Sequence, residues 1–341
     1  MITIKELARK LNLSTTTVSN VIHGKTHEVS ASTIERVEKA LIEYDYVPNI
    51  NARNLAQNKS KIIGLAMKPR ADKSSNIFMD PFISEVVGGI EKTVREAGYF
   101  MMIYASDEMD DILKQVSTWN VDGLLLFGLL GEDGAAVRRK YKKPVVCIDI
   151  YDMVCDPPVY TVGLEDEAGA YNAVRYLTDL GHRKIAFMSD DIIGVDLERF
   201  RGYKRALNDA GIENEDKNYL KLNPWKDEIE KSLSNICEIV RDFSAVFCTS
   251  DLYAVQLTCK LIDSGIRVPE DISVIGFDDN ALSRYHRPGI TTVHQDMEKK
   301  GVVAAETLIR LLKGMAVDKN MNQLPTRLVI RDSVRDLREA L

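Results

Sequence analysis

The spacing of apolar residues near the N-terminus predicts three short helices that share one small core. In the first helix, apolar residues recur at i, i+3, i+4 and i+7 as Ile4, Leu7, Ala8 and Leu11. The inward positions of the second are Val18, Val21 and Ile22, and those of the third are Ile34, Val37, Leu41 and Ile42. Two short helices joined by a tight turn form a helix-turn-helix unit, so we expect residues 1–47 to be an all-α domain of this kind.

Polar residues mark the beginning of each predicted helix. Thr3 and Ser14 can cap the first two helices, because their hydroxyl oxygens accept hydrogen bonds from the first turn. The third begins near Ser30 or Ser32, since Ser32 and Glu35 have the spacing of a capping box.

The second helix leaves a polar set on its outward surface. Its members are Thr15, Thr16, Thr17, Ser19 and Asn20. Small polar side chains at the start of such a helix can reach base edges in the major groove of DNA. A solvated polar helix face is the alternative, and the pattern alone does not choose between the two.

From Lys61 onward, short apolar runs alternate with amphipathic helical stretches. Ten runs are typical of strands: 62–67, 100–104, 123–127, 145–148, 160–162, 185–188, 245–248, 272–277, 291–293 and 327–330. Seven stretches have helical periodicity: 82–97, 107–119, 167–180, 197–210, 228–242, 252–264 and 297–313. This alternation predicts an α/β domain with parallel sheets covered on both faces. Because about ten strands are too many for one comfortable open sheet, we expect two lobes.

Several polar and aromatic residues lie just after predicted strands, early in a predicted helix or in a nearby loop. In open α/β sheets, ligands bind beyond the carboxyl ends of the strands. The candidates are Asp149, Arg199, Trp225, Ser250, Asp251, Asp278 and Asp279. Taken singly, an Asp or Ser at such a place is more often a cap, and a Trp is more often part of a core. Taken together, they are the groups that grip sugar hydroxyls and stack on the apolar faces of sugars.

The charge of the chain is divided unevenly between its parts. Residues 1–61 carry a net charge of +3, and the remainder carries −9. This asymmetry places the phosphate-seeking charge on the N-terminal domain alone. We expect DNA to repel the rest of the chain.

Other sequence features exclude several classes of protein. No run of about eighteen apolar residues exists, and Met1 leads directly into a capped helix, so neither a membrane span nor secretion is expected. The five cysteines form no C-x-x-C pair, which is typical of buried thiols in a cytoplasmic protein. The histidines lack metal-ligand spacing, and no phosphate-binding glycine motif or nucleophile elbow is present. We therefore expect no metal, no cofactor and no enzymatic activity.

Three motifs follow one another in the N-terminal domain. They are LSTTTVSNVIHG from Leu13 to Gly24, Val29-Ser30 with Thr33, and YVPNINARNL from Tyr46 to Leu55. In this order they resemble the signature of the lac repressor family of bacterial transcription regulators. The family usually has Arg where Asn20 stands and Asn where His23 stands. The resemblance implies a helix-turn-helix DNA-binding head at 1–47, followed by a hinge helix and linker at 48–60.

The resemblance also implies roles for individual residues of the head and hinge. Thr15, Thr16 and Asn20 are implied to face bases, while Thr17 and Ser19 hold phosphates. Leu55, on a hinge helix at about 49–57, is implied to wedge between central base pairs in the minor groove. The positions expected to contact DNA are Thr15, Thr16, Thr17, Ser19, Asn20, His23, Asn49, Arg53 and Leu55.

Four later segments are similar to the effector domain of the same family: GLEDEAGAYNAVRYLTDLGHRKIAFMSD, ERFRGYKRAL, VIGFDD and RPGITTVHQDMEKKG. That domain resembles periplasmic sugar-binding proteins, which have two lobes joined by three crossovers and a ligand cleft. The resemblance implies one effector-binding and dimerisation domain, with an N-lobe of about 61–160 and 292–320 and a C-lobe of about 161–291 and 321–341. The residues implied to contact the effector are Phe82, Asp149, Arg199, Trp225, Ser250, Asp251, Asp278 and Gln295. Ser250 replaces a frequent Asn, and 68–80 is longer than the usual link.

These features predict a cytoplasmic, effector-controlled transcription regulator, usually a repressor. Because two heads on half-sites about one helical turn apart add their affinities, we expect a homodimer on pseudo-palindromic double-stranded operator DNA. The expected effector is a sugar or sugar derivative. The sequence leaves open which sugar it is and whether the sugar releases or tightens DNA.

Two other classes of protein share parts of this pattern. A sugar-binding transport component would carry the first sixty residues as a helical appendage, and it predicts a leader that is not visible. An α/β enzyme fused to a DNA-binding domain predicts a nucleophile or metal cluster that we do not find.

Overall fold

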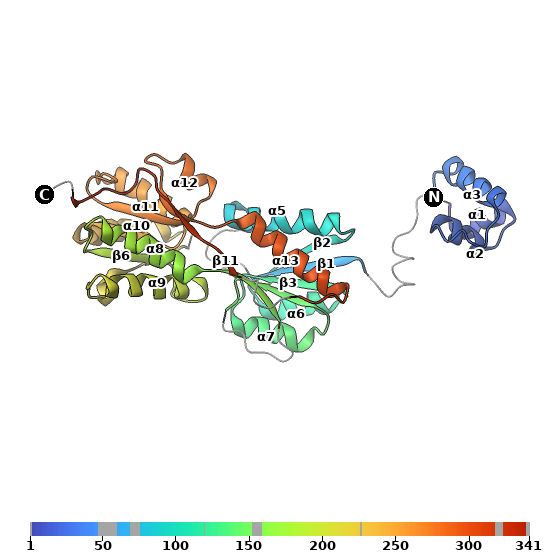
Figure 1. The fold of residues 1–341 in the computed structure, drawn as a ribbon, viewed down its shortest axis with the longest axis horizontal. Helices are drawn as coiled ribbons and strands as arrows, with labels where there is room; N and C mark the ends of the chain where they lie inside the picture. Colours follow the sequence, from blue (N-terminus) through green and yellow to red (C-terminus); the bar gives the residue numbers. More distant parts are fainter. Residues whose placement is uncertain are drawn as a thin grey trace. The chain divides into compact units, whose positions relative to one another are not determined.

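The computed structural model describes residues 2–46, 60–68, 76–118, 120–151, 159–225, 227–317 and 323–338. The chain divides into two compact units, Met1–Ser60 and Lys61–Leu341 (Figure 1). The expected hinge helix at about 49–57 lies outside the described residues, as do Asn49, Arg53 and Leu55.

The first unit contains three helices around a small core. They are α1 (Ile4–Leu11), α2 (Thr15–Ile22) and α3 (Ala31–Glu43). Thr3 and Glu6 form a reciprocal capping box on α1, and Ser14 caps α2. The buried core consists of Leu7, Ala8, Val18, Val21, Val37 and Ala40.

Of the two caps expected for α3, the structure confirms one, and one expected core position is wrong. The cap is Ser30, whose hydroxyl accepts the Thr33 amide hydrogen, rather than Ser32 with Glu35. Ile42 was expected in the core, but 82% of it is exposed, and Ala40 is buried in its place. The reason is the helical period, since Ala40 follows Val37 by three residues on one face, whereas Ile42 falls on the other side.

The second unit contains two six-stranded sheets, and each forms the centre of a lobe (Figure 1). The N-lobe sheet has the order β11-β5-β4-β3-β1-β2, and the C-lobe sheet has the order β12-β10-β9-β8-β6-β7. Every neighbouring pair of strands is parallel except β10 with β12.

The strands agree closely with the apolar runs of the sequence. Those of the N-lobe are β1 (Ile62–Met67), β2 (Phe100–Ala105), β3 (Gly123–Phe127), β4 (Val145–Ile148), β5 (Tyr160–Leu164) and β11 (Gln323–Leu324). Those of the C-lobe are β6 (Ile185–Ser189), β7 (Tyr219–Lys221), β8 (Ala245–Cys248), β9 (Ser273–Asp278), β10 (Thr291–His294) and β12 (Arg327–Val329). The pattern missed β7 and β11, which have three and two residues.

Helices cover both faces of each sheet. In the N-lobe, α5 (Pro81–Glu96) and α13 (Met297–Leu312) lie on one face, and α6 (Met109–Thr118) and α7 (Gly131–Lys140) lie on the other (Figure 1). In the C-lobe, α8 (Asp166–Asp179) and α9 (Val195–Asp209) lie opposite α10 (Ile229–Ile239) and α11 (Asp251–Asp263). The short α12 (Ala281–Tyr285) follows β9. Separate apolar clusters fill these four interfaces.

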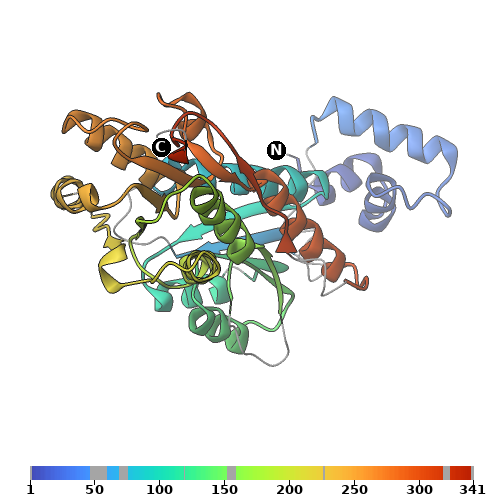
Figure 2. The ribbon, with the colours of Figure 1, turned by 60° about the vertical axis from the view of Figure 1, so that its left-hand side comes forward.

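The chain passes between the lobes three times, and Figure 2 shows this junction from a second side. The passages follow β5, β10 and β11. The lobe boundaries therefore differ from expectation by a few residues: β5 lies wholly in the N-lobe sheet, β10 pairs in the C-lobe sheet, and β11 pairs in the N-lobe sheet. In each case the strand completes its ladder in one sheet before the chain crosses.

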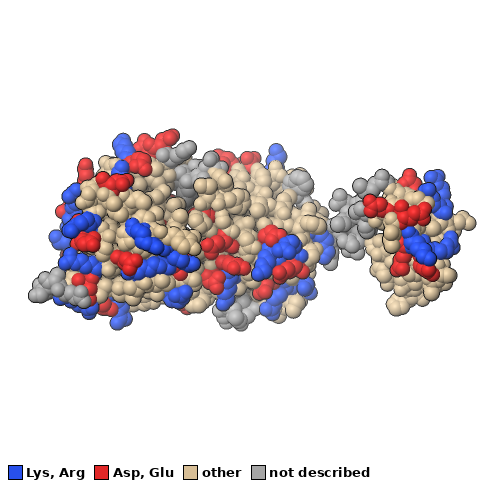
Figure 3. Space-filling model, turned by 90° about the horizontal axis from the view of Figure 1, so that it is seen from above, with Lys and Arg blue, Asp and Glu red and all other residues tan. Residues whose placement is uncertain are grey.

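Two further features bear on the surface of this unit. Acidic and basic side chains are mixed over the face seen in Figure 3, with no single basic patch on it. Within the described part of the chain, no helix is both long enough and apolar enough to cross a membrane.

Candidate functional site

The outward face of α2 carries small polar side chains. Thr15 and Thr16 are exposed, whereas Thr17, Ser19 and Asn20 are half-buried. Ser14 Oγ lies 2.8 Å from Thr17 Oγ1 and also accepts the Thr17 amide hydrogen at 2.9 Å. Thr17 is therefore held against the start of the helix, while Thr15 and Thr16 are exposed to solvent. His23, which ends α2, is exposed.

A cavity of about 220 Å³ lies between the two lobes of the second unit. Its wall contains six of the eight expected effector residues: Phe82, Asp149, Arg199, Ser250, Asp278 and Gln295. They come from the beginning of α5, the ends of β4, β9 and β10, the first turns of α9 and the N-cap of α11. Carboxyl ends of parallel strands and the helices that follow them thus supply the polar groups, as expected for α/β sheets.

Arg199 is almost fully buried at the wall of this cavity. Its Nε donates to Asp166 Oδ1 at 2.8 Å, and its Nη1 donates to the carbonyl oxygen of Thr249. The guanidinium carbon lies 3.7 Å from the centre of the Phe277 ring. Burial opposes the charge of Arg199, but Asp166, Asp196 and Asp278 outweigh this effect and raise the pKa. The cavity wall therefore contains a permanently charged planar donor.

A second group of polar contacts connects the two lobes beside the same cavity. Lys300 Nζ on α13 lies 2.9 and 2.7 Å from the two carboxylate oxygens of Asp149 and 2.9 Å from Gln295 Oε1. Gln295 Nε2 in turn donates to Asp278 Oδ1 at 2.5 Å. A chain of hydrogen bonds therefore runs from the end of β4 in the N-lobe to the end of β9 in the C-lobe. Its members in order are Asp149, Lys300, Gln295 and Asp278.

Sequence reasoning missed Lys300. It is completely buried, on the apolar side of α13 next to the interface with α5. Lys300 lies three residues after Met297 and four before Ala304, which is an inward position of the helix. Because a lysine is rarely buried unless it is paired, this position in the sequence could have indicated a buried ion pair.

Asp278 and Asp149 share an uncommon backbone conformation. Their φ angles are +125° and +55°, and that of Asp279 is +60°. Non-glycine residues in this region are uncommon and concentrate at functional sites. Burial raises the pKa of Asp278, Asp251 raises it further, and Arg199 lowers it. The result is a strained, buried carboxyl group aimed at the cavity.

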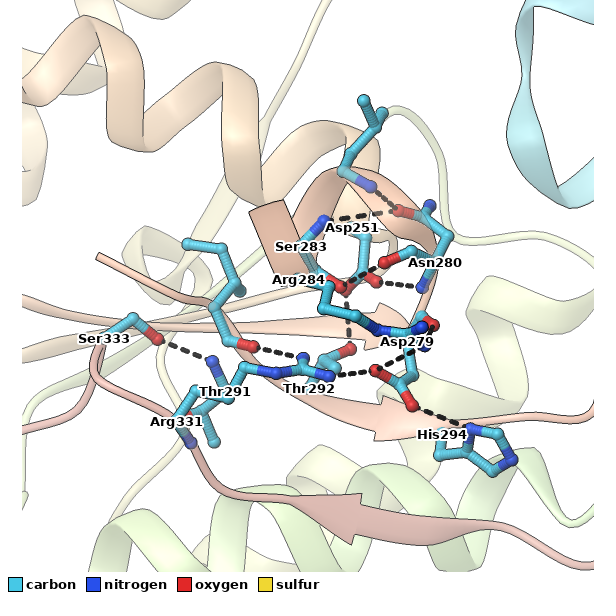
Figure 4. A network of polar contacts seen from close by, with 12 residues as sticks. Asp251, Asp279, Asn280, Ser283, Arg284, Thr291, Thr292, His294, Arg331 and Ser333 are labelled. Carbon is cyan, nitrogen blue, oxygen red and sulfur yellow. Dashed lines mark hydrogen bonds and ion pairs between the residues drawn. The ribbon is translucent and has the colours of Figure 1, made fainter. Parts of the chain in front are cut away.

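Asp251 does not lie on the cavity wall, in contrast to the expectation. Its Oδ1 accepts from Thr292 Oγ1 at 2.5 Å and its Oδ2 accepts the Asn280 amide hydrogen at 2.9 Å (Figure 4). A Cβ at position 276 would lie 2.3 Å from Asp251 Oδ1, so Gly276 leaves the room that turns this carboxylate toward the sheet. Burial raises the pKa of Asp251 to about 6, against the hydrogen bonds that lower it.

Neighbouring residues extend this network around the end of β9. Asp279 accepts from His294 Nδ1 at 2.9 Å and pairs with the guanidinium of Arg331 (Figure 4). Asn280 Oδ1 accepts amide hydrogens from the first turn of α12. The network therefore holds Asp279 and Asn280 in place and, with them, the adjacent Asp278.

Trp225 also lies away from the cavity wall. It follows β7 in a loop, and 52% of it is exposed. Its amide hydrogen is bonded to Asn223 Oδ1 at 3.2 Å. This hydrogen bond lies within the loop, and the indole does not line the cavity.

The histidines and cysteines give no metal site in the part of the chain that the structure describes. His182 is buried, with Nδ1 2.9 Å from Ser244 Oγ and Nε2 3.0 Å from the Arg335 carbonyl oxygen. Burial lowers the pKa of this imidazole. Cys147, Cys237 and Cys248 are buried thiols, but Cys259 is exposed, which differs from the expectation of burial. Cys155 lies outside the described residues.

Comparison with known proteins identifies the family. Residues 3–49 match the model of the bacterial regulatory proteins of the lacI family, and residues 174–334 match a periplasmic binding protein-like domain. The HTH-type transcriptional repressor PurR of Vibrio atlanticus (strain LGP32) is 34% identical over 350 residues, which cover 99% of this chain and 100% of that protein. PurR of Vibrio vulnificus (strain CMCP6) is 33% identical over the same shares.

Solved structures agree with this assignment over nearly the whole chain. The lac repressor dimer bound to operator and the anti-inducer ONPF is 26% identical, with a TM-score of 0.83 over 97% of this chain and 98% of that chain. The complex of the transcriptional regulator CelR with cellobiose is also 26% identical, with a TM-score of 0.72 over 98% of this chain and 100% of that chain. The chain therefore belongs to the lacI family of bacterial regulatory proteins, and it is a DNA-binding transcriptional regulator controlled by a small-molecule effector and not an enzyme.

Proposed function

We propose that this regulator is a cytoplasmic homodimeric repressor and that a carbohydrate bound between its lobes controls its affinity for operator DNA. The observation that carries the proposal is the cavity wall, where Arg199 from the C-lobe faces the same space as Asp149 from the N-lobe. A ligand that contacts both residues has different contacts when the lobes move, and only such differential contacts allow a ligand to shift a conformational equilibrium.

The cavity suits a small polyhydroxyl ligand. Its volume of about 220 Å³ is below the range of roughly 300–1,000 Å³ that is usual for drug-sized ligands, and it is closer to the size of a single sugar ring. The Arg199 fork donates hydrogen bonds, while Asp149 and Asp278 accept them, which is the combination that binds vicinal hydroxyls. The rings of Phe82 and Phe127 pack edge to face, with 5.7 Å between their centroids, and give the wall an apolar side. The CelR–cellobiose complex supports a carbohydrate in this family.

The proposed effector contacts are narrower than the sequence alone suggested. We propose Phe82, Asp149, Arg199, Ser250, Asp278 and Gln295 as contacts, because all six line the cavity. Asp251 and Trp225 are left out, since neither lies on the wall. We assign Asp251 the task of holding the 278–280 segment instead.

For DNA, we propose that the outward face of α2 enters the major groove. Thr15 and Thr16 are exposed. Together with Asn20 they contact bases, while Thr17, Ser19 and His23 contact the phosphate backbone of the DNA. A homodimer follows from the small size of one head, since two linked heads gain affinity from their effective concentration. The lac repressor dimer on operator DNA is consistent with this arrangement.

The proposed hinge couples the two functions. The segment 49–57 is rich in Asn and has about nine residues, and isolated helices this short are marginal in water. We propose that it folds when two copies meet over DNA, with Leu55 of each chain wedged into the minor groove, and that Asn49 and Arg53 contact the backbone. Strong amide-exchange protection of 49–57 in the free protein, equal to that on DNA, would contradict this mechanism.

One experiment tests the proposed function as a whole. Selection from random DNA with the full-length protein should enrich a pseudo-palindromic sequence. A panel of pentoses, hexoses and disaccharides is then added to the complex with that sequence, and at least one sugar should change the operator affinity. An Arg199→Ala variant should keep the operator preference and lose the sugar response, because the head is a separate unit. Selection of no sequence would contradict DNA regulation, and an unchanged sugar response in the variant would place the effector elsewhere.

A further inference from the structure

Lys300 differs from the other charged groups near the cleft in being buried inside a helix interface. Its side chain is 0% exposed, and its Nζ lies 5.0 Å from the centre of the Phe82 ring. Among the residues that the structure describes, its ammonium donates to Asp149 and Gln295. A buried ammonium is retained only where it is paired, so the Asp149 carboxylate and the Lys300 ammonium compensate each other.

The position of Lys300 determines which way Gln295 faces. A lysine ammonium can only donate hydrogen bonds, so the amide oxygen of Gln295 must point at it. The amide nitrogen is then directed at Asp278 Oδ1, which accepts at 2.5 Å. Asp278 favours the same orientation, because its carboxylate accepts the amide hydrogen. Lys300 and Asp278 together therefore fix the orientation of the Gln295 amide.

Lys300 also leaves the cavity rich in acceptors. Each oxygen of Asp149 accepts one hydrogen bond from the ammonium and keeps capacity for another from a ligand. Among the described residues, the wall contains Asp80, Asp149, Asp196 and Asp278 but two cations, Lys68 and Arg199. Both cations already face carboxylates outside the wall, since Lys68 Nζ lies 2.7 Å from Asp133 and Arg199 Nε lies 2.8 Å from Asp166.

We propose that the cleft selects neutral, donor-rich polyols and rejects phosphorylated or carboxylated sugars, and that Lys300 is the positioning residue that holds Asp149 in place as an acceptor for them. The inference rests on the proposed carbohydrate function and specifies its ligand class. A neutral polyol supplies hydroxyl hydrogens to the acceptors of Asp149 and Asp278. A phosphate ester brings negative charge among carboxylates whose neighbouring cations are already engaged, so like-charge repulsion opposes it.

The charge balance around Asp149 gives a test that needs no ligand. Burial raises the pKa of Asp149, and Lys300 is the foremost group that lowers it, while Asp166 raises it and Arg199 lowers it. Tyr151 also faces this carboxyl group, at the other side of Asp166. In a Lys300→Met variant the rise caused by burial is opposed by Arg199 but no longer by Lys300, so the pKa of Asp149 is higher than in the wild type. A raised carboxyl pKa in the folded state means that stability is lost as the pH rises from the unfolded pKa toward the folded one.

The melting temperature of Lys300→Met should therefore fall, relative to that of the wild type, as the pH rises from 5 to 8. Lys299→Met is the matched control, because Lys299 is the exposed neighbour on the same helix. A double variant, Lys300→Met with Asp149→Asn, removes both charges and should not show the slope. A pH-independent difference between Lys300→Met and Lys299→Met would contradict the proposed pairing of charges.

The ligand class is tested with matched probes and the full-length protein. D-glucose, D-galactose, D-mannose and cellobiose are compared, by calorimetry at pH 8, with glucose 6-phosphate, galactose 6-phosphate and mannose 6-phosphate. We expect a neutral sugar to bind and its phosphate ester to bind about a hundredfold more weakly. In Lys300→Met the neutral sugar should lose about tenfold in affinity, because Asp149 loses the ammonium that positions it, whereas Lys299→Met should match the wild type.

The outcomes separate this inference from the proposed function. Equal or tighter binding of a phosphate ester by the wild type overturns the inference and leaves carbohydrate control intact. Unchanged affinity for the neutral sugar in Lys300→Met overturns the role of Lys300 alone. Binding of no sugar in either set overturns the carbohydrate proposal and this inference with it.

Discussion

Arg199 Nε lies 2.8 Å from Asp166 Oδ1, and both side chains are almost fully buried where the chain passes from β5 into α8. The same carboxylate accepts from Tyr151 Oη at 2.7 Å through Oδ2. Tyr151 follows β4 in the N-lobe, whereas Arg199 belongs to the C-lobe. The Tyr151–Asp166 hydrogen bond therefore joins the lobes at a second place, in addition to the contacts from Asp149 through Lys300 and Gln295 to Asp278.

This pair predicts a large stability cost for losing one partner. Arg199→Met should lower the free energy of unfolding by about 3–5 kcal/mol, because Asp166 would be left as an uncompensated buried charge. Combining it with Asp166→Asn should recover a large part of the loss. Urea denaturation of the four proteins gives the coupling energy, and strictly additive losses would show that the two side chains do not depend on each other.

The network around Asp251 predicts a pH dependence of stability. The pKa of Asp251 is raised to about 6 by burial, above its unfolded value near 4. The folded protein therefore holds this proton more tightly than the unfolded chain does. The contribution of Asp251 to the free energy of unfolding should fall by about 3 kcal/mol as the pH rises from about 4 to about 6, and it should be level above that range.

Asp251→Asn should remove this slope, because an amide does not titrate. The variant should also be less stable overall, since its amide nitrogen cannot accept the hydrogen bond of the Asn280 amide or of Thr292. Asp263→Asn is the control, because Asp263 is exposed on the same helix. The measurement is urea denaturation between pH 4 and 7, and an unaltered slope in Asp251→Asn would assign the titration to another group.

The head gives a prediction about base preference. Thr16→Ala should relax the preferred sequence at one base pair in each half-site, with about 1–3 kcal/mol of discrimination lost there. The free energy of unfolding should change by less than about 0.5 kcal/mol, because the side chain is exposed. Repeating the selection from random DNA measures the first effect, with Ser32→Ala, an exposed change on α3, as the control. An identical selected sequence for Thr16→Ala and Ser32→Ala would remove Thr16 from the base contacts.

How far the sequence predicted this structure depends on the range of the interactions involved. The apolar runs located β1, β3, β4 and β8 to the residue, because a strand buried on both faces leaves its record in its own sequence. Asp149 and Asp278 were placed at the cleft for a similar reason, since their positions follow directly from the ends of strands.

The misses have a different origin. Lys300 pairs with Asp149 across 151 positions, and no local pattern records such a contact. Asp251 was expected to face the ligand because it follows a strand, but the space above Gly276 turns it toward the sheet. Helix α7 was overlooked because Gly131 and Gly134 lower its local propensity, although its neighbours in the lobe stabilise it.

The crossing of α5 and α13 gives the last prediction. A Cβ on Gly301 would lie 2.1 Å from the Val86 carbonyl oxygen, and a Cβ on Gly89 would lie 2.2 Å from that of Glu298. Both obstacles are backbone atoms of the partner helix, so the two helices would have to separate. Gly301→Ala should therefore destabilise the protein by about 3 kcal/mol, at the upper end of overpacking costs.

Gly88→Ala is the matched control for this contact. Gly88 is exposed on α5, and nothing lies within 4 Å of a Cβ built there. Alanine at an open helical position reduces the entropy of the unfolded chain, so this variant should be more stable than the wild type by about 0.5–1 kcal/mol. Because Lys300 directly precedes Gly301, separation of the helices should also move its ammonium away from Asp149, and Gly301→Ala should reproduce part of the pH slope of Lys300→Met. Urea denaturation at pH 5 and pH 8 measures both effects. Equal stabilities of the Gly301 and Gly88 variants would show that the close approach of α5 and α13 does not constrain the fold.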